Sequence, residues 1–558
     1  MDYLKLVEVY EELSGTTKKL EKVDILSKFL PKLKGHEEWI YLLRGRAFPD
    51  YDEREFGIST QLTIKAISKA SGVSSEEILE KFKKVGDVGE IAEDLVGKKR
   101  QSTLFSKKLK VLKVFGNLHK LAEIEGKGAV DRKLGFVVEL LTSASGKEAK
   151  YIVRTLLNDL RIGVAEATIR DSISKSFFEG DGEMANTIEE AHDLSNDFAE
   201  VLNIASKGKK GFDKIGLIPG RAMKVMLPVK VTEIKEAFRI CGKPLAVEHK
   251  YDGFRVVINK DETGKISLFT RRLDNVTKQF PDVVKIVKEK IKAKSFILDS
   301  EVVGYDFSKK KYLPFEAVSQ RIRRKHGIED LMKKLPVEIN VFDVMYLDGK
   351  SITDLSFEER RKLLEKVVDS ERWKIRYSKK FVSDNEEEVQ KFYENALDIG
   401  EEGVMMKNLK APYKPGRRVG YMVKMKPDAK DLDLVIVGAE YGTGKRAGGL
   451  TSFIVACKSG EEFLEVGKVS SGLKEKEEMG TTYGEMNKLL QPLIIEEGKN
   501  SVKIKPKVVI SVTYQNIQKS SKYSSGIALR FPRITHYRPE RGIYDIAKLE
   551  EIENDLED

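Results

Sequence analysis

The chain has 558 residues, of which 41% are hydrophobic and 34% are charged, and its 100 basic and 89 acidic residues give a net charge of +11. This length predicts about three or four domains, each with an ample core, and excludes a small disulfide-stabilised protein. Only two cysteines are present, Cys241 and Cys457, so a four-cysteine zinc site is excluded and a reducing compartment is expected.

The basic balance favours polyanionic partners, and the heavy use of Lys and Glu hints at a thermophilic source. Residues 1–13 form an acidic amphipathic pattern that is unlike a secretory signal, and no apolar run approaches about 18 residues. We therefore expect a soluble, cytoplasmic protein without membrane contact.

Residues 1–215 have helical spacing of apolar residues nearly throughout and predict an all-α domain. Ser145 and Glu148 form a capping-box pattern that begins a helix reaching Leu160, Gly163 ends it, and residues 165–178 predict the next helix. The outward faces of this pair would suit a phosphate backbone, although the residues alone favour an ordinary solvated surface with ion pairs. The basic residues concerned are Lys147, Lys150, Arg154, Arg161, Arg170 and Lys175.

The stretch 100–106 carries Gln101, Leu104 and Phe105, which resemble a shortened sliding-clamp-binding peptide that docks through a glutamine and a hydrophobic plug. Ordinary packing of Leu104 and Phe105 under the next helix is an equal alternative. Residues 206–211 are small, polar and glycine-rich, so we place a domain boundary near residue 215.

Residues 245–272 have the pattern of a β-hairpin with a turn at 261–264, and they hold Lys250 at the end of a strand. A lysine amine attacks phosphorus or a carbonyl carbon only when it is uncharged, and burial or nearby cations favour that form. The pattern Lys250-x-Asp252-Gly253-x-Arg255 is only suggestive alone, because an exposed strand lysine before a turn explains it equally well.

Residues 217–420 alternate strands and helices, and several strands place polar residues among apolar ones. Asp299 and Glu301 share one strand face, where a buried carboxylate must be paired, bound to a metal or bonded to a ligand. Phe342 and Glu402 have ordinary readings as a core residue and a turn acid. Lys424 and Lys426 also share a strand face. Together with Arg417 and Arg418 they suggest a phosphate site, and they could supply cations that lower the pKa of Lys250.

Residues 421–558 contain five short predicted strands, with one helix over about 474–490 between the third and the fourth. This is the element order of an oligonucleotide-binding (OB) barrel, and Pro427 and Asp428 suit a hinge into it. The last strand, over residues 527–533, and the residues directly after it carry three arginines, and an acidic helix ends the chain. The arginines are Arg530, Arg533 and Arg538.

Together these segments resemble the ATP-dependent DNA ligases of the archaeal and eukaryotic replicative type, within the covalent nucleotidyltransferase superfamily. The resemblance covers nearly the whole chain. It implies a multidomain α and α+β fold with an all-α DNA-binding domain (1–215), an α+β adenylation domain (216–420) and an OB-fold β-barrel domain (421–558). It rests on six motifs in the family's order: Lys250-x-Asp252-Gly253-x-Arg255, Thr270-Arg271, Asp299-x-Glu301, Phe342-Asp343, Glu402-Gly403-x-Met405-x-Lys407 with Lys424-x-Lys426, and Arg530-Phe531-Pro532-Arg533.

The resemblance implies ATP and Mg²⁺ as cofactors, nicked double-stranded DNA as substrate, a sliding clamp as a further partner, and a monomer that forms a lysyl-AMP on Lys250. Arg530 and Arg533 are expected to reach the pyrophosphate only when the barrel closes. The other implied roles are Glu248 facing adenine, Phe342 stacking on it, Glu301 holding the ribose and a metal, Glu402 holding Mg²⁺, Arg255, Arg271 and Arg418 contacting the nucleotide or the 5′-phosphate, and Lys424 and Lys426 contacting the α-phosphate.

The last motif departs from the family pattern. Asp-Lys commonly follows the third arginine, whereas Arg538 is followed here by Pro539, Glu540 and Arg541, which leaves the roles of Glu540 and Arg541 open. An RNA ligase or capping nucleotidyltransferase is the nearest alternative, a nicotinamide-cofactor ligase is disfavoured by the cysteine count, and a non-catalytic clamp-associated DNA-binding scaffold is the alternative from another class.

Overall fold

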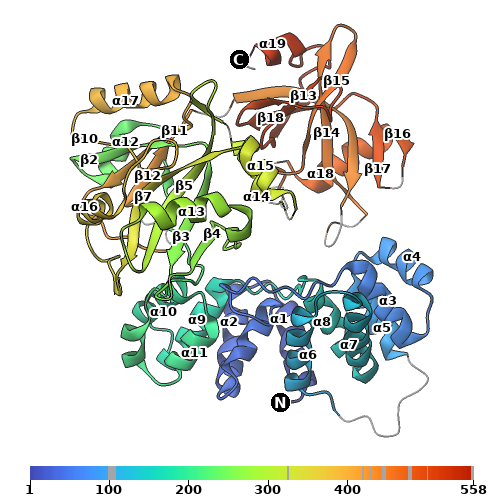
Figure 1. The fold of residues 1–558 in the computed structure, drawn as a ribbon. Helices are drawn as coiled ribbons and strands as arrows, with labels where there is room; N and C mark the ends of the chain where they lie inside the picture. Colours follow the sequence, from blue (N-terminus) through green and yellow to red (C-terminus); the bar gives the residue numbers. More distant parts are fainter. Residues whose placement is uncertain are drawn as a thin grey trace. The chain divides into compact units, whose positions relative to one another are not determined.

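The computed structural model describes residues 1–98, 108–313, 315–322, 324, 326–416, 420–427, 430–442, 446, 448–474, 481–498 and 500–554 (Figure 1). The chain divides into two compact units. The first consists of Met1–Ala66 and Arg100–Pro427, and the second of Ile67–Lys99 and Asp428–Asp558. Among the described residues, no helix combines the length and apolar character that a membrane crossing needs.

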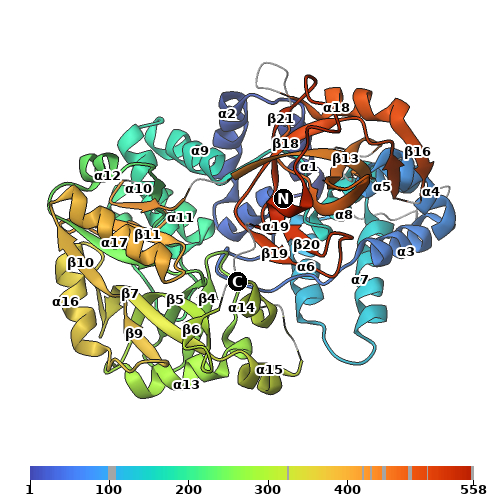
Figure 2. The same ribbon diagram turned by 90° about the horizontal axis from the view of Figure 1, so that it is seen from above.

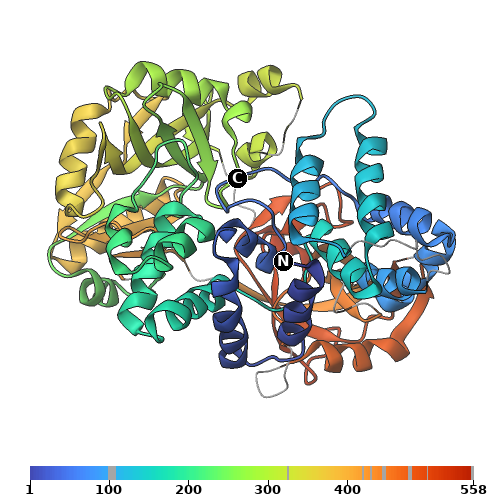
Figure 3. The same cartoon turned by 90° about the horizontal axis from the view of Figure 1, so that it is seen from below.

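The helical part of the first unit is built from amphipathic helices whose apolar stripes form a common core, and Figure 3 shows these blue and teal helices from below. The capping box of Ser145 and Glu148 is present. However, the helix it begins ends at Leu156 and does not reach Leu160, because Asn158 adopts a left-handed backbone conformation. The helices are α1 (Tyr3–Ser14), α2 (Lys19–Phe29), η2 (Glu37–Arg44), α6 (Val111–Glu123), α7 (Ala129–Ser143), α8 (Gly146–Leu156), α9 (Glu166–Phe178), α10 (Gly182–Ser195) and α11 (Phe198–Ala205).

The remainder of the first unit contains two β-sheets. The five-stranded sheet has the order β1 (Val229–Lys230), β12 (Met422–Met425), β11 (Gly403–Asn408), β2 (Leu245–Lys250) and β10 (Lys380–Ser383). Helices α12 (Ile234–Cys241) and α17 (Glu386–Asp398) cover one face of it and bury Val247, Met406 and Val423 (Figures 1 and 2). Since side chains alternate along a strand, Glu248, Lys250 and Lys424 lie on the opposite face.

The second sheet has the order β4 (Ile266–Thr270), β3 (Phe254–Lys260), β5 (Phe296–Asp306), β7 (Val337–Leu347) and β8 (Lys350–Ser351). One face of this sheet, which carries Val256 and Leu298, forms a core with α13 (Pro281–Lys290) and α16 (Phe357–Val367). Its other face meets the first sheet, because Val257 and Ile297 belong to one cluster with Met422 of β12. The predicted motif residues Glu248, Lys250 and Lys424 therefore lie on the face of the first sheet that meets the second.

The predicted hairpin is correct only for its second half. Strands β3 and β4 pair as an antiparallel hairpin, but β2 belongs to the other sheet and pairs with β10 and β11. Residues 251–253 therefore carry the chain from one sheet to the other. Strand β12 lies in the five-stranded sheet beside β11. The first compact unit therefore extends to Pro427, past the domain boundary predicted at residue 420.

The second unit contains α4 (Ser75–Val85), α5 (Val88–Gly97) and a β-rich C-terminal part, while α3 (Thr60–Ser71) spans the division. The sheet order is β15-β14-β13-β17-β16, with β18 pairing β13 and β21. These elements are β13 (Lys430–Tyr441), β14 (Leu450–Ser459), β15 (Glu462–Val469), α18 (Tyr483–Leu490), β16 (Ile494–Glu497), β17 (Ser501–Ile504), β18 (Val509–Tyr514), β19 (Ile517–Lys519), β20 (Ile527–Leu529), β21 (Arg533–Tyr537) and α19 (Leu549–Glu553).

Two features of this part differ from the sequence prediction. The strand expected over residues 527–533 is broken into β20 and β21, because Phe531 has a positive φ of 48° and Pro532 follows it. The strands β16 and β17 were not predicted. The acidic C-terminal helix α19 is anchored, since Ile552 is fully buried in the same core as Phe453 and Val466.

Candidate active site

Lys250 is the last residue of β2, as predicted, and Gly403 lies opposite it in β11. Its Nζ donates a hydrogen bond to Glu402 Oε2, and Lys426 Nζ donates to the other carboxylate oxygen at 2.9 Å. A Cβ at Gly403 would collide with the carbonyl oxygen of Met425, and the positive φ of 139° there also favours glycine. Glycine thus allows β11 and β12 to bring Glu402 and Lys426 to the nucleophile.

The charges around Lys250 are strongly coupled. Burial opposes the charged form of Glu402, but Lys250 and then Lys426 outweigh it, so the pKa of Glu402 lies below its ordinary value. Burial and the charges of Lys250 and Lys426 lower the pKa of Lys424. The sequence led us to expect cations beside Lys250, and the structure adds a carboxylate that accepts its hydrogen bond.

Glu301 is partly buried on β5, and burial raises its pKa to about 8. Asp299 and Glu402 act in the same direction, whereas Lys250 and Arg255 oppose the shift. A carboxyl group of this kind ionises more readily when a cation approaches it. A cation bound beside Glu301 would therefore favour its ionised form.

Arg255 joins the second sheet to the loop at Tyr413 through Asp299, which is fully buried. Its Nε and Nη2 donate to the two oxygens of Asp299 at 2.8 and 2.5 Å, and its Nη1 donates to the carbonyl oxygen of Met226 at 2.9 Å. The Tyr413 hydroxyl donates to Asp299 at 2.6 Å. Arg255 was predicted to contact the nucleotide, but most of its N–H groups donate to acceptors within the protein. The role of Tyr413 was not predicted from the sequence.

Glu248 and Phe342, the residues expected around adenine, are linked by buried cations. Arg361 Nη1 and Lys407 Nζ donate to the two oxygens of Glu248 at 3.0 and 2.6 Å. The Lys407 ammonium also lies 4.8 Å from the centre of the Phe342 ring. The neighbouring Arg360 forms a bidentate pair with Asp343, at 2.8 and 3.0 Å. Arg360 and Arg361 were missed because a helix with paired arginines reads as a surface helix.

Comparison with known proteins identifies the family of the chain. The description "DNA ligase N terminus" matches residues 2–174, "ATP dependent DNA ligase domain" matches 225–426, and "ATP dependent DNA ligase C terminal region" matches 446–541. The DNA ligase of Nanoarchaeum equitans is 43% identical over 99% of this chain and 98% of its own length, and that of Thermococcus onnurineus is 41% identical over 99% and 97%. The chain belongs to the ATP-dependent DNA ligase family.

The family membership settles the class of the protein. It is an enzyme of archaeal type that uses ATP and acts on nicked DNA, which sets aside the capping-enzyme, RNA-ligase and scaffold alternatives. The solved structure Pmar-Lig_Pre shares the fold, with a TM-score of 0.58 and 17% identity over 95% of this chain and 98% of that one. The multidomain fold class predicted from the sequence is confirmed.

The ligase carries a second titratable pair directly behind Lys250. Glu401 is 7% exposed, and burial followed by Asp252 raises its pKa to about 8. His249 points to the other face of β2, where its ring lies 4.9 Å from that of Phe392, and burial lowers its pKa to about 4. Both shifts favour the uncharged forms of Glu401 and His249.

The predicted DNA-contacting residues differ in their surroundings. Arg154 does not lie on an outer face, since it is 7% exposed and its guanidinium lies 5.4 Å from the ring of Tyr151. Arg170 pairs with Glu189 at 2.9 Å. The remaining three also have acidic partners, and a role in DNA binding stays a prediction for the whole set, which is Lys147, Lys150, Arg154, Arg161 and Arg170.

Three further predicted arginines differ in exposure, and some predicted residues lie outside the described chain. Arg271 is exposed in the turn after β4, and its charge is one cause of the lowered pKa of Lys424. Arg530 is 8% exposed beside the ring of Phe531, and Arg533 is exposed at the start of β21. Five predicted residues are outside the described residues: Gln101, Leu104, Phe105, Arg417 and Arg418.

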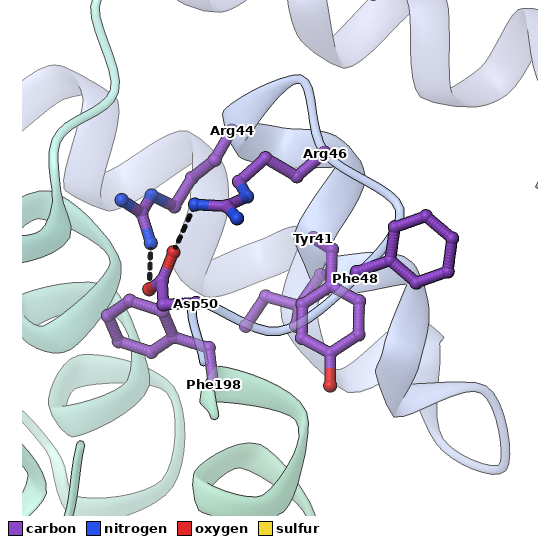
Figure 4. Close-up of a pocket in the computed structure, with 7 residues that line it drawn as sticks. Tyr41, Arg44, Arg46, Phe48, Asp50 and Phe198 are labelled. Carbon is purple, nitrogen blue, oxygen red and sulfur yellow. Dashed lines mark hydrogen bonds and ion pairs between the residues drawn. The ribbon is translucent and has the colours of Figure 1, made fainter. Parts of the chain in front are cut away.

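A small pocket in the helical part is lined by charged residues that compensate one another. Asp50 accepts hydrogen bonds from Arg44 and from Arg46, the latter at 2.9 Å (Figure 4). Burial opposes the charged form of Asp50, but the hydrogen bond with His192 and the charges of Arg44 and Arg46 hold its pKa far below its usual range. Arg44 also pairs with Glu166 at 3.1 Å. Lys224 donates to the same Glu166 at 2.6 Å, so the network joins the helices to the segment that precedes β1. We interpret this ion-pair network as structural, because its charged groups are bonded to one another.

Proposed function

We propose that this ligase seals a single-strand break in duplex DNA, joining a 5′-phosphate to a 3′-hydroxyl, through an adenylate carried on Lys250. The observation that carries the proposal is the placement of Lys250 at the end of β2, hydrogen-bonded to Glu402 and beside Lys424 and Lys426. A lysine in such a cationic setting is suited to attack a phosphoryl group, whose charge the other lysines stabilise.

The proposed reaction has three displacements at phosphorus. Lys250 Nζ, after losing a proton, forms a P–N bond to the α-phosphorus of ATP, and the bond to pyrophosphate breaks. An oxygen of the DNA 5′-phosphate then displaces Lys250 and forms a DNA-adenylate. Finally, the 3′-hydroxyl attacks the 5′-phosphorus, AMP leaves, and the phosphodiester bond is made.

The contact with Glu402 gives the first step a physical requirement. It is an ion pair, whereas attack needs the uncharged amine, so Lys250 has to part from Glu402 before it reacts. Lys426 already shares Glu402 and can hold the carboxylate after Lys250 leaves. Burial and the charges of Lys250 and Lys426 lower the pKa of Lys424, and a bound α-phosphate would favour its charged form.

Mg²⁺ is proposed as the metal that Glu301 and Glu402 would hold. The fit rests on convergence of negative charge, since Glu402 and Asp299 both raise the pKa of Glu301. Among the described residues no group of three or more His, Cys, Asp or Glu forms a ready-made metal cluster, and Mg²⁺ commonly takes one or two carboxylates together with substrate phosphates. When bound, the ion would neutralise phosphate charge.

The remaining assignments stay proposals of the family resemblance. Phe342 would stack on adenine, Arg255 and Arg271 would contact the nucleotide or the 5′-phosphate, and Arg530 and Arg533 would meet the leaving pyrophosphate. Clamp binding through the stretch 101–105, DNA contacts from the helices, a monomeric state and a cytoplasmic location are likewise proposed. The domain limits 1–215, 216–420 and 421–558 remain predictions.

The deciding experiment is incubation with ATP labelled at the α-phosphate, with Mg²⁺ present, followed by denaturation and mass analysis. Wild-type protein should gain one AMP on Lys250, and Lys250→Ala should gain none. Lys410→Ala, an exposed lysine that follows β11, is the matched control and should label normally. Absence of label from wild-type protein, or a label on another side chain, would overturn the proposal.

A further inference from the structure

Glu248 is a buried carboxylate held by two buried cations. Glu248 and Arg361 are each 1% exposed, and Lys407 is 4% exposed. One carboxylate oxygen accepts from Arg361 at 3.0 Å and the other accepts from Lys407 at 2.6 Å. An ionised carboxylate offers about four acceptor positions, so two remain after these bonds are made. The group is thus fixed in direction and still able to accept.

The two cations come from different elements, which determines the direction of the carboxylate. Lys407 is on β11, next to β2, and Arg361 is on α16, where its Nη2 also donates to the carbonyl oxygen of Ser378. The Lys407 ammonium lies 4.8 Å from the Phe342 ring centre and 4.7 Å from that of Phe357. The Lys407 ammonium therefore contacts both Glu248, which is expected at the edge of adenine, and Phe342, which is expected to stack on its face.

We infer that Lys407 and Arg361 are positioning residues that hold the Glu248 carboxylate as a fixed acceptor for the exocyclic amino group of adenine, and so set the base selectivity of this ligase. The inference rests on the proposed adenylation of Lys250 by ATP. A carboxylate flanked by two donors can only accept. Adenine presents an amino donor where guanine presents an oxygen acceptor, so guanine would meet acceptor against acceptor.

Both cations are needed for this selection. Two buried partners compensate the carboxylate charge and leave it one orientation, whereas a single partner leaves it free to swing about that bond. A polar site built to pair with a donor rejects a ligand that lacks the donor, because its own acceptor is then buried without a partner. Loss of either cation should therefore weaken discrimination between bases.

The test measures kcat/KM for formation of the Lys250 nucleotidyl adduct with ATP, GTP and purine riboside triphosphate, which lacks the amino group. Wild-type protein should prefer ATP over the riboside by at least ~10-fold and over GTP by more. In Lys407→Met and in Arg361→Gln, the preference over the riboside should fall to within ~3-fold, mainly through KM for ATP. Each ratio is taken on one sample, so the folded fraction cancels.

The matched controls are Lys410→Met and Arg372→Gln, both exposed in the same part of the chain, and both should keep the wild-type preference. Unchanged preference in the Lys407 and Arg361 variants would overturn the inference. A wild-type protein that uses the riboside as well as ATP would overturn it without any variant. A wild-type protein that forms no adduct with ATP would instead refute the proposed function, which keeps the two failures distinct.

Discussion

Replacing both Arg255 and Asp299, which form a buried ion pair, should destabilise the protein less than replacing either one alone. Asp299 is completely buried and Arg255 is largely buried, and they share two hydrogen bonds, at 2.8 and 2.5 Å. Removing one partner of such a pair leaves an uncompensated charge and costs about 3–5 kcal/mol. Asp299→Leu and Arg255→Met should each lower the free energy of unfolding by this amount.

The double variant should be more stable than either single variant by about 2 kcal/mol, because apolar side chains replace both charges and only the Tyr413 hydroxyl and one backbone carbonyl lose partners. The chain has two tryptophans, Trp39 and Trp373, so a Trp39→Phe background lets Trp373 fluorescence report urea unfolding beside β9 (Ile375–Tyr377). Single-variant effects that simply add would refute the reasoning.

Three further predictions concern titration, thiol access and backbone space. The folded state keeps the Glu401 proton up to about pH 8, while the unfolded chain releases it near its ordinary pKa of 4.5. Stability should therefore fall as pH rises through this window, and Glu401→Gln should flatten the slope in urea titrations. Cys241 and Cys457 are buried, and burial raises their pKa to about 12 and about 11, so a thiol reagent should label both only after unfolding, and fast labelling of native protein would contradict this. Gly403→Ala would push a Cβ into the carbonyl oxygen of Met425, and it should reduce adenylation at least ~10-fold; wild-type labelling would show that β11 can shift.

Local patterns predicted the strands of the catalytic part well, because alternation along one strand is visible in the sequence. Lys250 at a strand end, and Lys424 and Lys426 on one face, follow from the two-residue period. Strand pairing is different in kind. β2 pairs with β11, more than 150 residues later in the chain (Lys250 opposite Gly403), and no local signal separates this from pairing within one hairpin.

The burial of Arg360 and Arg361 could not be predicted from the neighbouring sequence, because it also depends on contacts between distant segments. Arg360 and Arg361 follow the capping box of Ser356 in a highly charged helix, and a surface helix would have the same composition. Only the tertiary structure places Asp343 and Glu248 against them. A useful signal would have been the number of acidic residues predicted on buried strands, since each needs a cation from elsewhere in the chain.

In the proposed mechanism, the ion pair with Glu402 would keep Lys250 unreactive until a nucleotide binds. Glu402 accepts from Lys250 and from Lys426, so the resting site has one carboxylate between two ammonium groups, with Lys424 close by. A triphosphate adds negative charge to this group and competes with Glu402 for the lysines. In the proposed mechanism, Lys424 and Lys426 would turn to phosphate oxygens, and Glu402 would be one of the residues able to hold a metal ion. Lys250 would part from Glu402 and release its proton to solvent before it attacks. Loss of the proton would then depend on nucleotide binding, because the Lys250 ammonium has to leave Glu402 before it can react.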